Sequence, residues 1–99
     1  MGKEENSEEK SKGITFEGGP GDKVECAVVI RGAGNHSAGV LAEYQYLEEK
    51  FGEPEVDWKM AGQTLLTHED RMYDRMEIKP SEGSLIFIIF EITDFFGKF

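Results

Sequence analysis

The chain has 99 residues, of which 38 % are hydrophobic, and its 20 acidic and 11 basic residues give a net charge of −9. This length suits a single domain with one modest core, and the negative charge opposes binding to nucleic acids and to anionic membrane surfaces. The single cysteine, Cys26, excludes an internal disulfide, and its apolar neighbours indicate a small buried side chain.

No segment has the pattern of a signal peptide. The longest apolar run, residues 85–90, is far shorter than the ~20 residues that a membrane-spanning helix needs. We therefore expect a cytoplasmic protein that does not associate with membranes.

Residues 1–12 contain four Glu and three Lys, and Met1 is the only residue among them with a large apolar side chain. Such a composition buries too little apolar surface to offset the entropy of ordering, so we predict a disordered charged tail. The remainder, residues 13–99, is predicted to form one domain. The domain itself carries most of the negative charge.

Two strands are predicted next in the chain. Residues 14–16 and 23–30 have strand-like compositions, and the segment GGPGD at 18–22 between them is typical of a turn. Together these segments suggest a hairpin.

One amphipathic helix is predicted over Ser37–Phe51, because apolar residues recur there at helical spacing. Gly52 stands where a helix commonly ends, and Pro54 prevents the helix from resuming. The predicted apolar stripe consists of Val40, Leu41, Tyr44, Leu47 and Phe51, and the predicted polar face of Glu43, Glu48, Glu49 and Lys50.

Three further strands are predicted in the second half, at 56–66, 72–79 and 84–92. Gly62 indicates a bulge in the first of them. Asp74 is a misfit in the second, because it falls on the apolar face. The third is apolar on both faces, which predicts a position in the interior of the sheet.

The predicted fold is therefore α+β, in the order β-β-α-β-β-β, with a mixed or mostly antiparallel sheet and the helix packed on one face. A β-grasp-like arrangement is an alternative by analogy. The other face of the sheet then needs a cover. Either the C-terminal segment with Phe95, Phe96 and Phe99 folds back over it, or a second copy of the chain covers it in a homodimer.

The segment Arg31–Gly39 joins a strand to the helix, as a phosphate-binding loop would. A dinucleotide loop needs the spacing G-x-G-x-x-G, but here Gly32 and Gly34 are followed by Ser37, and Gly39 comes two residues late. A simple bend is the main interpretation, with positive φ at Gly32 and Gly34 and a helix cap from Asn35 or Ser37.

An alternative use of this loop is to hold a small ligand or an anion. The candidate ligand-binding residues are Arg31, Gly32, Gly34, Asn35, His36 and Ser37.

We predict no catalytic residues, no cofactor and no metal site. His36 and Ser37 are adjacent at a helix start, where neighbouring side chains point apart, and Cys26 lies in a predicted core strand. His68, Glu69 and Asp70 are interpreted as a solvated turn, since consecutive residues there cannot all face one ion.

Acidic residues gather along the helix and the loop that follows it. The candidate partner-binding residues are Glu43, Glu48, Glu49, Glu53, Glu55 and Asp57. The sequence therefore predicts a small acidic interaction domain without catalytic activity, which is homodimeric or docks a basic protein partner, as an immunity or inhibitor protein would. The alternative is a ligand-binding protein or an enzyme that uses the loop Arg31–Gly39.

Overall fold

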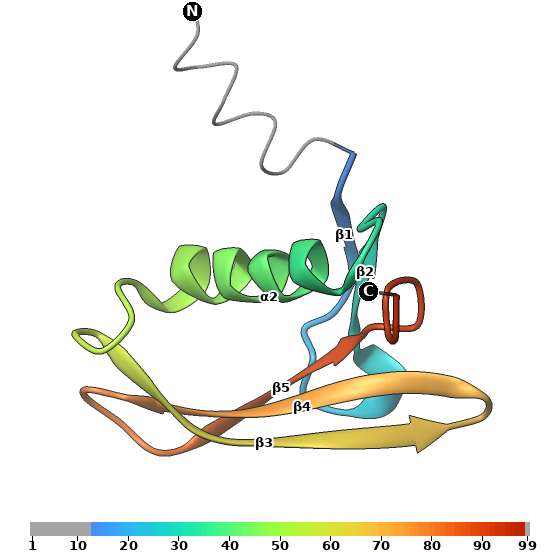
Figure 1. Cartoon of the computed structure of the whole chain (residues 1–99). Helices are drawn as coiled ribbons and strands as arrows, with labels where there is room; N and C mark the ends of the chain where they lie inside the picture. Colours follow the sequence, from blue (N-terminus) through green and yellow to red (C-terminus); the bar gives the residue numbers. More distant parts are fainter. Residues whose placement is uncertain (1–12, 99) are drawn as a thin grey trace, which may run out of the picture.

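Five strands and one long helix follow one another in the order β-β-α-β-β-β in the computed structural model, which describes residues 13–98 (Figure 1). The predicted tail at 1–12 lies outside the described residues. The elements are β1 (Thr15–Gly18), the short 3-10 helix η1 (Val24–Cys26), β2 (Val28–Arg31), α2 (His36–Phe51), β3 (Trp58–His68), β4 (Arg71–Pro80) and β5 (Ile86–Glu91). The α+β prediction is confirmed.

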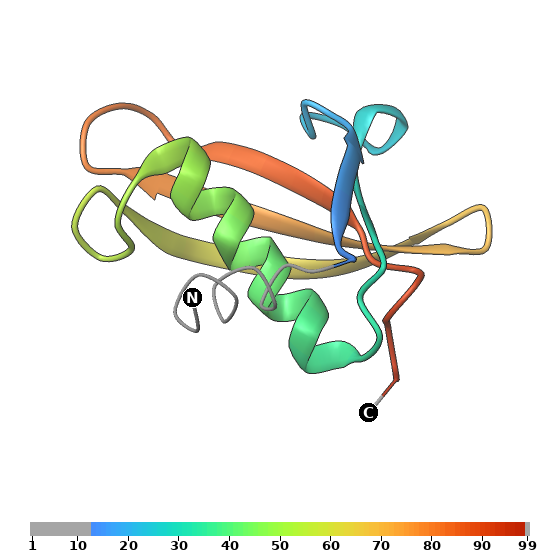
Figure 2. The ribbon, with the colours of Figure 1, turned by 90° about the horizontal axis from the view of Figure 1, so that it is seen from above.

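The strands form one mixed sheet in the order β1-β2-β5-β4-β3. Only β2 and β5 run parallel, and the other three neighbouring pairs are antiparallel. The helix α2 crosses one face of this sheet (Figures 1 and 2). β5 lies in the middle with both Ile88 and Ile89 buried, as its two apolar faces predicted.

The second predicted strand, 23–30, is shorter than expected. Val24–Cys26 forms η1 instead, and the strand begins only at Val28. The turn explains the difference, because the Gly21 amide donates to the carbonyl oxygen of Cys26 at 2.7 Å and holds this segment out of the ladder. Cys26 is therefore not in a strand and is only half-buried.

Helix α2 begins and ends where capping residues permit. The Asn35 side chain accepts a hydrogen bond from the Ala38 amide at 2.9 Å, so Asn35 rather than Ser37 is the cap. At the other end Gly52 has a φ of 105°, and its amide donates to the Glu48 carbonyl oxygen at 2.9 Å.

The buried face of α2 is rotated from the predicted stripe. Its buried residues are Gly39, Ala42, Glu43 and Leu47. Leu41, predicted to be in the core, is 45 % exposed. Gly39 accounts for part of the rotation, because the Phe95 ring packs so closely on it that a Cβ there would overlap the ring.

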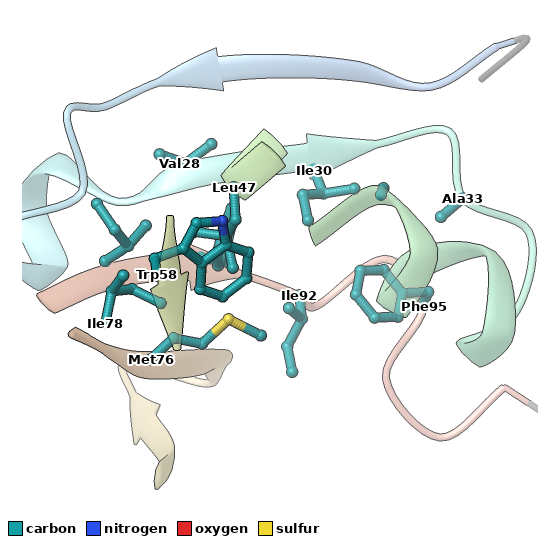
Figure 3. Packing of buried hydrophobic residues seen from close by; sticks show 12 residues of the cluster. Val28, Ile30, Ala33, Leu47, Trp58, Met76, Ile78, Ile92 and Phe95 are labelled. Atoms are coloured by element: carbon teal, nitrogen blue, oxygen red, sulfur yellow. The ribbon is translucent and has the colours of Figure 1, made fainter. Parts of the chain in front are cut away.

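The main core lies between α2 and the sheet (Figure 3). Trp58, Phe90 and Leu47 are among its largest fully buried side chains. Phe95 also belongs to this core, at its helix-start end, so the C-terminal segment packs on the helix side of the sheet.

Of the two alternatives predicted for covering the far face, the one in which the C-terminal segment folds back over it is therefore wrong. Instead η1 packs there, with Val24 against the small cluster of Ala27, Tyr73 and Ile89. Phe87 on the same face is 38 % exposed, and the Arg75 guanidinium lies 4.4 Å from the centroid of its ring. Phe96 is exposed, and Phe99 lies outside the described residues.

Candidate functional site

The glycines of the loop Arg31–Gly39 have structural roles in this fold. Gly32 has a φ of +88°, and a Cβ there would overlap the Gly13 carbonyl oxygen. Gly34 has no positive φ, contrary to the prediction, and a Cβ added there would meet open space. Gly39 lies inside the helix against Phe95. The three glycines therefore serve a close backbone contact, a bend and a packing contact.

The polar groups of the same loop are engaged within the chain. Arg31 lies 3.5 Å from a carboxylate oxygen of Glu17 and 3.4 Å from one of Asp94. The His36 amide donates a hydrogen bond to the Lys98 carbonyl oxygen at 2.7 Å, and the His36 ring lies edge-on to the Phe95 ring. Ser37 is exposed. The charge of Arg31 and the His36 amide at the helix start therefore interact with groups of the same chain, which does not favour an anion site here.

The acidic residues predicted to bind a partner fall into three groups: four exposed carboxylates, one exposed carboxylate that is hydrogen-bonded within the chain, and one that is buried. Glu48 and Glu49 are exposed on α2, and Glu53 and Glu55 are exposed in the loop after it. Asp57 is exposed but holds the helix end, because its Oδ2 accepts a hydrogen bond from the Glu53 amide at 2.7 Å.

Glu43 forms the third group, and its predicted position on the polar face is wrong. It is 0 % exposed and lies between α2 and the sheet. The helix is rotated so that Glu43 faces β4, on which Asp74, the apolar-face misfit of the sequence, is 6 % exposed. The two misplaced carboxyl groups of the sequence thus meet each other in the structure.

Their environment makes Glu43 a neutral acid. Burial, followed by the hydrogen-bonding and charge interactions with Asp74, raises the pKa of Glu43 to about 10. Both carboxyl oxygens of Glu43 are buried without a hydrogen-bond partner in good geometry. The Asp74 carboxylate does have a hydrogen-bond donor, since the Gln63 side-chain amide nitrogen donates to its two oxygens at 2.9 and 2.8 Å.

A surface groove of about 500 Å³ lies between the edge strand β1 and helix α2. We call it the acidic groove, and define it by its lining residues Ile14, Phe16, Gln45, Glu48 and Glu49. Phe16 is 37 % exposed, and its ring centroid lies 5.3 Å from that of Tyr46. Apolar surface and two exposed carboxylates are therefore adjacent.

Comparison with protein-family models, curated proteins and solved structures finds no match. The inference of function therefore rests on the residues of the acidic groove.

The other polar clusters in the described part of the chain are weaker candidates for a binding site. His68 Nε2 lies 3.9 Å from a carboxylate oxygen of Glu69, and both side chains are solvent-exposed, as the turn prediction implied. Arg71 donates to the buried Glu91 carboxylate at 2.8 Å. Within residues 13–98, no three His, Cys, Asp or Glu side chains are grouped to hold a metal ion. No helix in that range is long and apolar enough to span a membrane.

Sequence reasoning missed the groove because its two walls are distant in the chain. Phe16 comes from the first strand and Ile14 immediately precedes it, whereas Gln45, Glu48 and Glu49 come from the helix. The composition of β1, Thr-Phe-Glu-Gly, did not predict that all four of its residues would be exposed. The helix half of the site was found by its charge alone.

Proposed function

We propose that this protein is a non-catalytic interaction domain that binds a basic segment of another protein in the acidic groove. The observation that carries the proposal is the position of the Glu48 and Glu49 carboxylates beside the exposed Phe16 ring. A small inhibitor or immunity protein that blocks a basic target in the cytoplasm is one concrete form of this function.

The groove matches the two parts of a basic side chain. Lys and Arg bury their aliphatic stems on apolar surface while their charged heads remain hydrated, and Ile14 with Phe16 supplies such a surface. Hydrogen bonds from ammonium or guanidinium groups to carboxylates are stronger than neutral ones. Glu48 and Glu49 form no ion pair within the described part of the chain, so both are available for a partner.

The charge of the chain supports the same choice of partner. A net charge of −9 attracts basic surfaces at long range and increases association rates at low salt. The exposed Glu53 and Glu55 extend the negative field beyond the C-terminal end of α2.

Charge reversal tests the proposal. A fluorescent peptide in which Lys and Thr alternate is titrated with the wild-type protein and with E48K/E49K, and anisotropy gives the Kd. We expect the double variant to bind at least about tenfold more weakly, a loss of ~1.4 kcal/mol. Binding should also weaken as salt is raised.

The matched control is E25K/E82K, which reverses two exposed acidic residues outside the acidic groove and changes the net charge equally. It should retain most of the wild-type affinity. Equal losses in both double variants would show that net charge, and not the groove, attracts the peptide, and the proposal would then be abandoned.

A further inference from the structure

The edge strand β1 offers backbone groups for pairing next to the acidic groove. It lies at one end of the sheet, β2 is its one neighbour among the strands of residues 13–98, and all four of its residues are exposed. In an antiparallel pair, alternate residues of the edge strand direct their N–H and C=O groups away from the partner strand. These outward groups can accept an added strand.

The groove lies where the side chains of an added strand would point. Phe16 faces the helix side of β1, as its contact with the Tyr46 ring shows. A strand added beside β1 would lie about 4.8 Å farther out, and every second side chain would face the helix side. Those side chains would meet Glu48 and Glu49.

The other edge of the sheet has the opposite character. β3, Trp58–His68, likewise has a single neighbour among the described strands, but none of its 11 residues is acidic. It carries Lys59 near one end and His68 at the other. Because opposite charges attract, a basic strand is drawn to the β1 edge and not to the longer β3 edge.

We infer that the partner segment binds as an extended strand added to the outer edge of β1, with Lys or Arg at every second position facing the acidic groove. This inference rests on the proposed function, since it specifies how the same groove is used. Main-chain hydrogen bonds would supply affinity, and the alternate basic side chains would supply specificity.

Backbone methylation of the peptide tests the added strand without changing its charge. Two isomers of the alternating Lys and Thr peptide are made, one N-methylated at the Lys residues and the other at the Thr residues. In an added strand only one of these sets of N–H groups faces β1. We expect one isomer to lose about tenfold or more in affinity, equivalent to ~1.4 kcal/mol, while the other stays close to the parent peptide.

A third peptide of the same composition, with its Lys residues in one block, tests the alternation and should bind more weakly than the alternating parent. If both methylated isomers bind like the parent, the added strand is refuted while groove binding stands. If the parent peptide itself does not bind, or binds E48K/E49K equally well, the proposed function fails as well.

Discussion

The carboxyl group of Glu43 is the most unusual residue-scale feature of the core. It is fully buried, and its pKa is raised to about 10 by burial and by Asp74. In the unfolded chain its pKa is near the ordinary value of 4.5. Folding therefore requires Glu43 to keep a proton that the unfolded chain has already lost at neutral pH.

This difference fixes the sign of a pH effect. Below the unfolded pKa, Glu43 is protonated in both states and costs no ionisation energy. As pH rises from about 4.5 towards 10, the native state holds a proton that the unfolded state has released, so stability falls. An ion-paired carboxylate has the opposite effect, because its lowered pKa in the native state makes stability rise with pH.

We predict that E43Q removes this decline and is more stable than wild type at pH 8, because glutamine keeps the shape without an ionisable group. The measurement is the free energy of unfolding from urea titrations at several values between pH 5 and 9. The exposed E48Q is the control and should keep the wild-type pH dependence. Parallel curves for wild type and E43Q would contradict the account.

At the scale of elements, helix α2 and the C-terminal segment depend on each other. Phe95 is buried against Gly39 near the start of the helix, and the carbonyl oxygen of Lys98 accepts a hydrogen bond from the His36 amide. The segment after β5 thus seals the helix-start end of the core and leaves the far face of the sheet to η1.

This contact predicts an inverted substitution effect at Gly39. In an open helix, Gly→Ala stabilises by ~1 kcal/mol because glycine is a poor helix former. A Cβ at Gly39 would overlap the Phe95 ring, so G39A is expected to destabilise the fold by about 1–3 kcal/mol through overpacking. Urea denaturation measures the change, with G34A, where nothing lies near the added Cβ, as the neutral control. A stabilised G39A would contradict the packing described for Phe95.

The elements themselves were largely predictable from local signals. Gly52 and Pro54 correctly ended the helix, and the two apolar faces of β5 correctly placed it in the sheet interior. The helix face was misjudged because periodicity counted Glu43 as polar and Leu41 as apolar. Only Asp74, a misfit on its own strand, hinted at a buried acid, and its pairing with Glu43 depends on tertiary structure.

For the molecule as a whole, the two edges of the sheet are chemically different. The β1 edge adjoins the acidic groove with Glu48 and Glu49, whereas the β3 edge has no acidic residue along its length. The sequence could predict the acidic helix but not the strand beside it, since the groove forms only when the first strand lies next to α2. This charge difference between the two edges of the sheet, rather than a motif in the loop Arg31–Gly39, is what favours a single docking edge.

Amide chemical-shift mapping by NMR tests the central claim most directly, because it locates a bound peptide without altering the protein. ¹⁵N-labelled protein is titrated with the alternating Lys and Thr peptide. The account predicts that the largest shift changes lie in residues 14–18 and 45–49, the two walls of the acidic groove. Largest changes along β3, or in the loop Arg31–Gly39, would contradict it.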